Sequence, residues 1–249
     1  MIITIITVAY NSNSTIKDTM DSVLNQVCKD YEYIVVDGAS KDGTLDAIEE
    51  YVPKFDGRMR YISEPDKGIY DAMNKGIGMA QGDVIGILNS DDFFADEHVV
   101  GKLLETFKEE PEVDGVYANL CYVSQNKTDN IVRRWITGPQ KPFAKGWLPA
   151  HPTFYVKKSV YEKYGLFNLD YKLAADFELM LRFVERYHIK LTYLPEFLVK
   201  MRLGGATNNS IRNIVEQDKE CVRAFKENQV SVSRMYLLFR YLPKIKQYL

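Results

Sequence analysis

Two adjacent carboxylates, Asp91 and Asp92, are the residues of this sequence with the clearest capacity for chemistry. They lie on a short polar run that begins at Asn89, and they offer the hard oxygen ligands that Mg²⁺ and Mn²⁺ prefer. An acidic loop repels an anionic ligand unless a cation lies between them, so the run points to a metal shared with a diphosphate. The alternative is that Asp91, Asp92 or Asp96 caps the helix that follows.

Three further polar clusters also follow short apolar runs. They are Thr7 to Asn11, Asp37 to Thr44 and Glu64 to Gly68. Asp37 could accept hydrogen bonds from a base or a ribose, or it could form an ordinary Asx turn beside Gly38. Thr7 suits a plain strand as well as it suits a ligand site.

The elements that position these clusters alternate between strands and helices. Strands are expected at Ile2–Tyr10, Tyr31–Asp37, Arg60–Ser63 and Val84–Leu88. This alternation is typical of βαβ units with parallel strands, and ligands bind such sheets at the carboxyl ends of the strands. All four clusters stand at those ends, so the pattern predicts that they meet at one edge of the sheet.

The intervening segments have helical periodicity. One helix is expected to bury Ile16, Met20, Val23, Leu24 and Val27, and another, which starts near Gly68, to bury Ile69, Met73, Ile77 and Ala80. Later elements are expected as a helix at Val99–Phe107, one or two strands in Val113–Val123, a loop-rich stretch over Asp129–Pro152, a helix at Ala174–Tyr187, a strand at Leu191–Val199 and helical structure over residues 211–249.

The composition limits the class of protein. A chain of 249 residues with 46% hydrophobic side chains can bury one catalytic unit with a C-terminal appendage. Its net charge of -2 argues against nucleic acid as a partner. Cys28, Cys121 and Cys221 lack metal-ligand spacing and fit a reducing cytoplasm. The apolar start is too short for a signal peptide, and the sequence has no bilayer-spanning apolar run.

The order and spacing of the motifs resemble the family 2 glycosyltransferases. The matching segments are residues 6–11, 37–44, 64–76 and 88–92, and the resemblance extends over about residues 2–205. It is strongest for bacterial enzymes that build exopolysaccharide, capsule or lipopolysaccharide. It implies a GT-A fold, which is an α/β fold with a Rossmann-like, mostly parallel but mixed sheet between helices, here with a C-terminal helical extension.

The resemblance also implies a division of the chain. Residues 1–208 would form the catalytic domain, with a nucleotide-binding half at 1–95 and an acceptor-binding half at 96–208. Residues 209–249 would form the helical extension.

The donor-site residues follow from the same resemblance. Those that would bind the nucleotide sugar are Thr7, Tyr10, Asn11, Asp37, Gly38, Ser40, Asp66, Asn74, Lys75 and Asp91. Asp91 and Asp92 would hold the divalent metal, Mn²⁺ or Mg²⁺, and the ribose. Many relatives have Asp where this chain has Asn89, and the missing charge predicts weaker metal binding.

The resemblance implies an inverting mechanism, which needs a base on the face opposite the leaving diphosphate. Asp176 matches the family's base, and Glu178 is the second candidate. Many relatives have Glu in place of Ala175, so the missing like charge is expected to lower the pKa of the base. The alternative is that Asp176 only stabilises the first turn of its helix.

His151, Trp147 and Arg182 are expected on the acceptor or diphosphate side. The resemblance places His151 near the diphosphate or the metal, although an ordinary structural histidine fits the sequence equally well. Trp147 could stack on a sugar or pack in the core.

The predicted function is transfer of a sugar from a nucleotide diphosphate, UDP by family precedent, to a hydroxyl of a growing cell-surface glycan. A polyprenyl-diphosphate-linked acceptor is the working hypothesis. The alternative is a non-catalytic protein that binds nucleotide sugars or glycans. A dinucleotide-dependent oxidoreductase and a P-loop enzyme are excluded, because their glycine motifs are absent from the sequence. The oligomeric state stays open, with a homodimer as one option.

The tail over residues 229–249 mixes basic and aromatic side chains. Its basic residues are Arg234, Arg240, Lys244 and Lys246. Such a segment can lie on an anionic bilayer, which would place a cytoplasmic enzyme on the inner face of the membrane. It could equally pack its apolar side on the catalytic domain.

Overall fold

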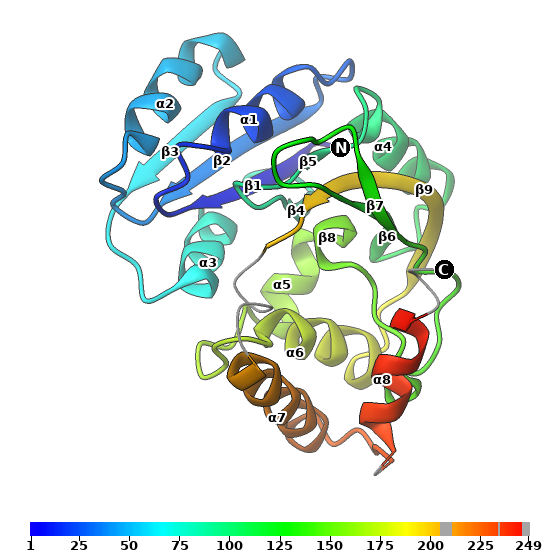
Figure 1. Cartoon of the computed structure of the whole chain (residues 1–249). Coiled ribbons are helices and arrows are strands. Elements are labelled where there is room, and N and C mark those ends of the chain that lie inside the picture. Colours follow the sequence, from blue (N-terminus) through cyan, green and yellow to red (C-terminus); the bar gives the residue numbers. More distant parts are fainter. Residues whose placement is uncertain (205–210, 234, 246–249) are drawn as a thin grey trace.

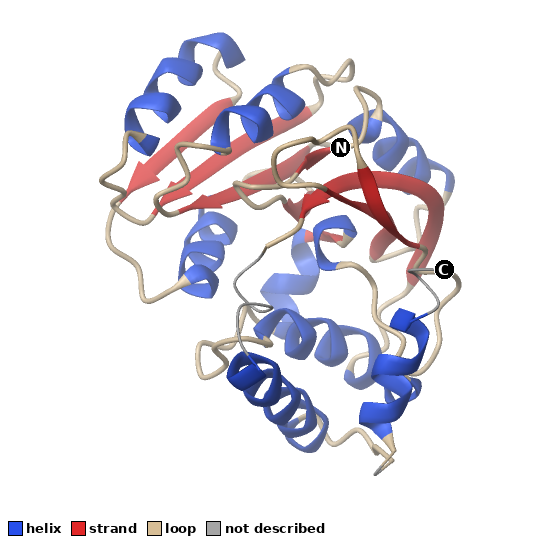
Figure 2. Ribbon diagram, viewed as in Figure 1, coloured by secondary structure: helices blue, strands red, loops and turns tan. Residues whose placement is uncertain are grey.

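A single mixed sheet forms the middle layer of the protein (Figure 2). The computed structural model describes residues 1–204, 211–233 and 235–245. Within these residues, nine strands pair in the order β3-β2-β1-β4-β8-β6-β9-β5, and β7 pairs with β6 beside this path. The strands are β1 Ile3–Ala9, β2 Tyr31–Asp37, β3 Met59–Ser63, β4 Val84–Ile87, β5 Phe93–Phe94, β6 Gly115–Val123, β7 Ile131–Trp135, β8 Tyr155–Lys157 and β9 Leu191–Arg202.

The first four long strands are parallel. β1 pairs in parallel with both β2 and β4, and β2 pairs in parallel with β3. β8 is antiparallel to β4 and to β6, whereas β9 runs parallel to β6. The last residues of β1 and β2, Ala9 and Asp37, are register partners. The polar segments that follow these two strands therefore start at the same edge of the sheet.

Helices cover both faces of the sheet (Figure 1). They are α1 Ile16–Leu24, α2 Thr44–Tyr51, α3 Ile69–Met79, α4 Val99–Glu109, α5 Lys158–Tyr164, α6 Ala175–Leu181, α7 Ile211–Glu227 and α8 Tyr236–Ile245. Helices α1, α2 and α4 lie on one face, and α3, α5 and α6 lie on the other. Helix α6 continues into a π-helical turn over Arg182–Arg186. Helices α7 and α8 pack on the α6 side.

The alternation along β1 explains why both faces need cover. Ile3 and Ile5 belong to the apolar core beneath α1, α2 and α4, whereas Ile6 and Val8 belong to the core on the α3 side. Successive side chains of a strand point to opposite faces, so a strand of apolar residues must be buried twice. The second core also contains Phe225 of α7 and Tyr236 of α8. The C-terminal helices therefore complete the core that supports α6.

Several sequence-based expectations were wrong in detail. Val27 lies beyond the end of α1 and is 60% exposed, because the chain leaves the helix and its N–H bonds the carbonyl of Glu97. Ile69 opens α3 and is 48% exposed. The stretch expected to be loop-rich contains β7. Where continuous helical structure was expected, α7 ends at Glu227 and α8 begins at Tyr236. The predicted domain boundary at 208/209 falls within 205–210, outside the described residues.

Candidate active site

The ends of β1 and β2 are tied together by a network around Asp37. This buried carboxylate accepts hydrogen bonds from the Ser40 hydroxyl, from the Ser40 backbone N–H at 3.1 Å and from the Ser63 hydroxyl at 2.6 Å. The Ser40 hydroxyl in turn accepts from the backbone N–H of Asn11 at 2.8 Å. A carboxylate has about four acceptor positions, and Asp37 uses about three of them to organise the turn.

Tyr10, Gly38 and Asp66 form an open rim beside this network. The Tyr10 side chain is 69% exposed. A Cβ added at Gly38 would lie 2.7 Å from Oδ2 of Asp66 and 3.2 Å from Cδ2 of Tyr10, so only glycine lets both side chains approach this closely. An exposed aromatic ring next to a carboxylate can hold a planar base by stacking and hydrogen bonding.

The acidic loop after β4 is fixed by hydrogen bonds that side chains of other segments donate to its backbone carbonyls. The Thr19 hydroxyl donates to the carbonyl of Asp92 at 2.6 Å, and Nη1 of Arg202 donates to the carbonyl of Asp91 at 2.7 Å. Asp92 is fully buried, and burial together with the charge of Asp91 raises its pKa well above the usual range. Burial also raises the pKa of Asp91, although nearby Arg202 and His151 oppose this effect. The loop therefore holds two carboxylates that gain from a cation.

Two oxygen atoms in this loop could serve as ligands of such a cation. Oδ1 of Asp92 and Oδ1 of Asn89 are buried and have no hydrogen-bond partner. Buried polar atoms without partners are rare in folded proteins, and both atoms are acceptors that suit Mg²⁺ or Mn²⁺. Within the described part of the chain, no three His, Cys, Asp or Glu side chains gather into a complete metal site. The residues thus fit a metal whose remaining ligands are diphosphate oxygens and water.

A row of side chains connects the acidic loop to helix α6. Nδ2 of Asn89 lies 3.3 Å from Oδ2 of Asp92 and 3.3 Å from Nε2 of His151. Nδ1 of His151 lies 3.6 Å from Oδ2 of Asp176. The Tyr70 hydroxyl donates to the other oxygen of Asp176 at 3.3 Å. Asp92, Asn89, His151 and Asp176 therefore form one continuous row of side chains.

The contacts of His151 determine where its proton lies. Because the Asn89 amide donates to Nε2, that nitrogen must accept, and the ring proton lies on Nδ1 toward Asp176. Burial lowers the pKa of His151, while the charges of Asp176 and Asp91 partly offset this effect. The neutral imidazole is thus a fixed donor that faces the carboxylate of α6.

Glu178 and Arg182 serve the structure of α6. The Glu178 carboxylate is buried and accepts from Nε of Arg182 at 3.0 Å and from Nδ2 of Asn228 at 3.0 Å. Arg182 also donates to the carbonyls of Tyr164 and Leu166. These contacts occupy both side chains, which leaves Asp176 as the carboxylate of this helix that is available to an acceptor.

Several residues expected at the donor site hold loops together. The Thr7 side chain is buried and accepts from the Tyr33 hydroxyl at 3.0 Å, as an ordinary strand residue would. Asn74 bonds both the N–H and the C=O of Phe167. Lys75 donates to the carbonyl of Pro65 at 2.8 Å. The structure therefore favours positioning roles for Thr7, Asn74 and Lys75.

Trp147 lies in the wall of a cavity between β7, α6 and α8. Its indole N–H donates to the carbonyl of Thr137 at 3.1 Å, and its ring packs edge-on against Tyr117 and Phe143. The side chain is 8% exposed.

Three site residues escaped the sequence analysis. Tyr70 contacts Asp176, Ser63 contacts Asp37, and Arg202 holds the acidic loop. Tyr70 lies within the matched segment 64–76, so its place beside a chemical motif was the available signal. Arg202 was missed because the predicted strand ended at Val199, whereas β9 continues through it.

The sequence of this chain is similar to the sequences of known glycosyltransferases. The family model described as "Glycosyl transferase family 2" matches residues 4–168. A mycobacterial "PGL/p-HBAD biosynthesis glycosyltransferase" from Mycobacterium bovis is 26% identical over 252 residues, which cover 97% of this chain and 91% of the relative. An uncharacterized glycosyltransferase of Mycobacterium tuberculosis is 31% identical over 186 residues, which cover 72% of this chain and 68% of the relative.

Solved structures agree on the fold. S. aureus TarS 1-349 in complex with UDP matches with a TM-score of 0.65 at 16% identity, over 96% of this chain and 68% of that chain. The mannosyltransferase PcManGT from Pyrobaculum calidifontis, in complex with GDP-Man and Mn²⁺, matches with a TM-score of 0.66 at 16% identity, over 99% of this chain and 71% of that chain. The sheet and its helices thus form a GT-A fold. The chain belongs to glycosyl transferase family 2 and is a nucleotide-sugar-dependent glycosyltransferase of EC class 2.4.

Proposed function

We propose that the protein is an inverting, metal-dependent glycosyltransferase that moves a sugar from a UDP-sugar to a hydroxyl of a growing cell-surface glycan. The observation that carries this proposal is the row from Asp92 through Asn89 and His151 to Asp176. It joins oxygen ligands suited to a metal with a carboxylate suited to proton abstraction. The M. bovis relative, a PGL/p-HBAD biosynthesis glycosyltransferase, supports a role in biosynthesis.

The donor would bind across the carboxyl ends of β1, β2 and β4. The exposed Tyr10 ring and the Asp37 and Asp66 carboxylates would contact the nucleoside. Asp91, Asp92 and Asn89 would hold Mn²⁺ or Mg²⁺, which neutralises charge on the leaving diphosphate when it is bound. UDP is proposed as the nucleotide because solved structures of TarS contain UDP or UDP-GlcNAc. PcManGT, which was solved with GDP-Man, makes GDP the alternative.

Asp176 would act as the base. As the acceptor oxygen bonds to the anomeric carbon and the bond to the diphosphate oxygen breaks, the hydroxyl proton would pass to the Asp176 carboxylate. The Nδ1–H of His151 and the Tyr70 hydroxyl approach the two oxygens of this carboxylate and would fix its orientation. Attack from the side opposite the diphosphate inverts the anomeric carbon.

A lipid-linked acceptor is proposed from the outer surface of α8. Met235 beside the helix and Leu237, Leu238 and Phe239 on it are exposed. Arg234 and the Lys244 and Lys246 side chains, on which the membrane prediction also rested, lie outside the described part. None of the described helices has both the length and the apolar character needed to span a bilayer. The protein is proposed to bind peripherally to the cytoplasmic face of the membrane. The double variant Leu237→Ser/Leu238→Ser should then cosediment less with phosphatidylglycerol vesicles.

Donor hydrolysis separates an enzyme from a non-catalytic binding protein. The purified chain is incubated with UDP-, GDP- and CMP-sugars, with Mn²⁺ or with EDTA, and nucleotide release is followed by ³¹P NMR. We expect slow release from one UDP-sugar that needs the metal. Binding of that donor without any release, with or without added polyprenyl-diphosphate-linked acceptors, would instead identify a binding protein.

A further inference from the structure

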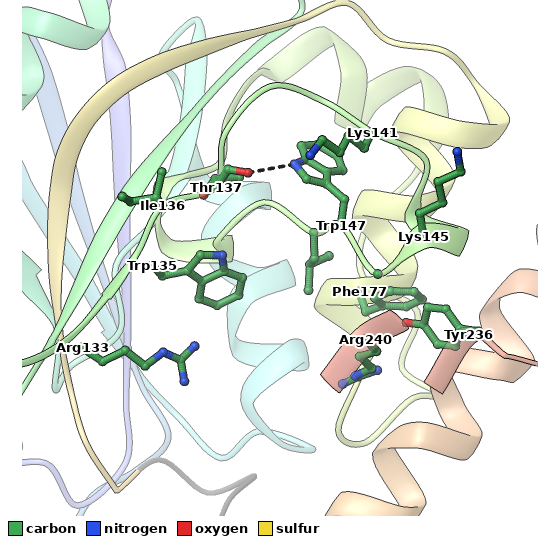
Figure 3. Close-up of a pocket in the computed structure, with 12 residues that line it drawn as sticks. Arg133, Trp135, Ile136, Thr137, Lys141, Lys145, Trp147, Phe177, Tyr236 and Arg240 are labelled. Atoms are coloured by element: carbon green, nitrogen blue, oxygen red, sulfur yellow. Dashed lines mark hydrogen bonds between the residues drawn. The ribbon is translucent and has the colours of Figure 1, made fainter. Parts of the chain in front are cut away.

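A cavity that contains none of the donor-site residues opens between β7, α6 and α8 (Figure 3). Its volume is about 260 Å³. Pockets for whole small molecules hold about 300–1,000 Å³, so this cavity suits one part of a larger ligand. Its walls come from the turns after β7, from the short 3₁₀ turn at Phe143–Lys145, from α6 and from α8.

The polar lining of the cavity is cationic. Arg133, Lys141, Lys145 and Arg240 line it, and its described lining residues include no carboxylate. Arg240 is held by Gln217 and lies near Asp218, whereas Lys141 and Lys145 are exposed and form no ion pair with any described residue. Two lysines without acidic partners beside a concave surface create a field that attracts an anion.

The apolar lining is aromatic and rigid. Trp135, Trp147, Phe177 and Tyr236 form the walls. Trp147 is fixed by its hydrogen bond to Thr137, and Phe177 packs near Tyr236 with ring centroids 6.3 Å apart. Flat aromatic surfaces beside cations suit a group that is partly apolar and partly anionic, such as a sugar phosphate or the head of a prenyl phosphate.

The cavity borders α6, the helix that carries the proposed base. Phe177 follows Asp176 in α6, and Arg240 donates to the thiol of Cys221. Burial raises the pKa of that thiol, and the charge of Asp176 adds a smaller effect in the same direction. His151 and the acidic loop contact Asp176 from another direction. A ligand in the cavity would therefore sit between α6 and α8, apart from the donor loop.

We infer that this cavity binds a phosphate or diphosphate group of the acceptor. Lys141 and Lys145 would contact the anion, and the two tryptophans would form the wall against which its sugar or prenyl neighbour packs. This inference rests on the proposed function for its role in catalysis. Binding of the anion can be tested without that function.

Intrinsic fluorescence offers a direct test, because the two tryptophans of the chain, Trp135 and Trp147, both line the cavity. The full chain is titrated in EDTA with inorganic phosphate and, separately, with farnesyl phosphate. EDTA removes any cation that could hold phosphate at Asp91 and Asp92. We expect a saturable fluorescence change whose Kd rises at least about tenfold when both lysines are reversed in Lys141→Glu/Lys145→Glu.

Two control variants separate this site from its surroundings. Lys108→Glu reverses one exposed charge at the end of α4 and should leave the titration unchanged. Asp92→Asn alters the donor loop and should also leave it unchanged. Tighter binding of farnesyl phosphate would identify a lipid-linked acceptor, and binding of inorganic phosphate alone would identify a soluble phosphorylated one. Absence of any saturable change, or equal affinity in the double variant, would overturn the inference.

Transfer assays then connect the site to catalysis. With a phosphorylated acceptor, the double lysine variant should raise the acceptor KM at least about tenfold while the donor KM stays constant. A protein that binds farnesyl phosphate in the cavity but releases no nucleotide from any donor would refute the proposed function and leave the anion site standing. An unchanged acceptor KM in an active enzyme would refute the cavity's role in acceptor binding.

Discussion

At the scale of single residues, the carboxylates of Asp176 and Glu178 lie in the same turn of α6 but have opposite environments. Asp176 is half-buried and faces His151 and Tyr70, whereas Glu178 is buried and engaged by Arg182 and Asn228. The sequence presents both as first-turn acids of one helix. Their partners come from distant segments, and these partners separate a candidate base from a structural ion pair.

Exchanging each carboxylate for its amide tests that difference. Asp176→Asn should lower kcat by about 10²–10⁴-fold with little change in donor affinity, because only proton abstraction is lost. Glu178→Gln should keep kcat within a few-fold but destabilise the fold by about 3–5 kcal/mol, because Arg182 loses its buried partner. Steady-state kinetics and urea denaturation measure both effects. The reverse pattern would make Glu178 the base.

The pKa of Asp92 predicts a pH-dependent stability of the metal-free protein. Its folded-state pKa lies above that of the unfolded chain, so between the two values the folded protein keeps a proton that the unfolded chain has lost. The free energy of unfolding therefore falls as pH rises above about 4, the ordinary aspartate pKa. Asp92→Asn removes this loss.

Melting curves in EDTA at pH 5 and pH 8 check this prediction. The wild type should lose more stability than Asp92→Asn between these pH values, and the variant should melt higher at pH 8. A variant that melts lower than the wild type at both pH values would show that the carboxylate is stabilising without a metal.

At the scale of elements, Gly146 allows α8 to pack on the catalytic core. Gly146 has a φ of +79°, and a Cβ there would lie 2.2 Å from the carbonyl oxygen of Phe239 in α8. A side-chain rotation cannot relieve this clash, because the obstructing atom belongs to the backbone of α8. The close approach brings α8 and Arg240 to the cationic cavity.

Gly146→Ala should therefore displace α8, and Gly57→Ala provides the matched control. Gly57 has a φ of +80° but nothing within 4 Å of its added Cβ. Both variants incur about 1–2 kcal/mol for a left-handed residue, and only Gly146→Ala adds the clash. Urea denaturation and hydrogen exchange over residues 236–245 should show a larger loss in Gly146→Ala. Equal losses in both variants would mean that α8 does not depend on this contact.

The elements also show where sequence patterns suffice. β2 was predicted to the residue, and β1, β3 and β4 within about one residue, because apolar runs between polar turns define buried parallel strands. β7 was missed because its residues, from Ile131 to Trp135, are exposed or half-buried and show no apolar run. Tyr236, the first residue of α8, packs in the core against distant segments, and the local sequence does not reveal this contact.

The site shows the same division. Adjacent aspartates and the motif order identified Asp91, Asp92 and Asp176 as candidates, because residue type and spacing limit their chemistry. Contacts such as Asn89 with His151 join segments 62 residues apart, so they exist only once the sheet has formed. Local patterns likewise could not show that Asn74 and Lys75 tie loops together.

At the scale of the whole molecule, the two parts of the candidate site come from different parts of one fold. The parallel strands β1, β2 and β4 present the rim and the acidic loop, and α6, supported by α7 and α8, presents Asp176 (Figure 1). His151 lies between these parts and contacts both. Under the proposed mechanism, this arrangement would bring a donor diphosphate and an acceptor hydroxyl to one place.

The most direct test of this account is the melting temperature of three proteins with UDP, with Mn²⁺ and with both. A ligand that binds the folded state raises the melting temperature by mass action. We expect UDP with Mn²⁺ to stabilise the wild type and Asp176→Asn equally, and to leave Asp92→Asn nearly unchanged. Equal stabilisation of Asp92→Asn, or a wild type indifferent to UDP with Mn²⁺, would contradict the account.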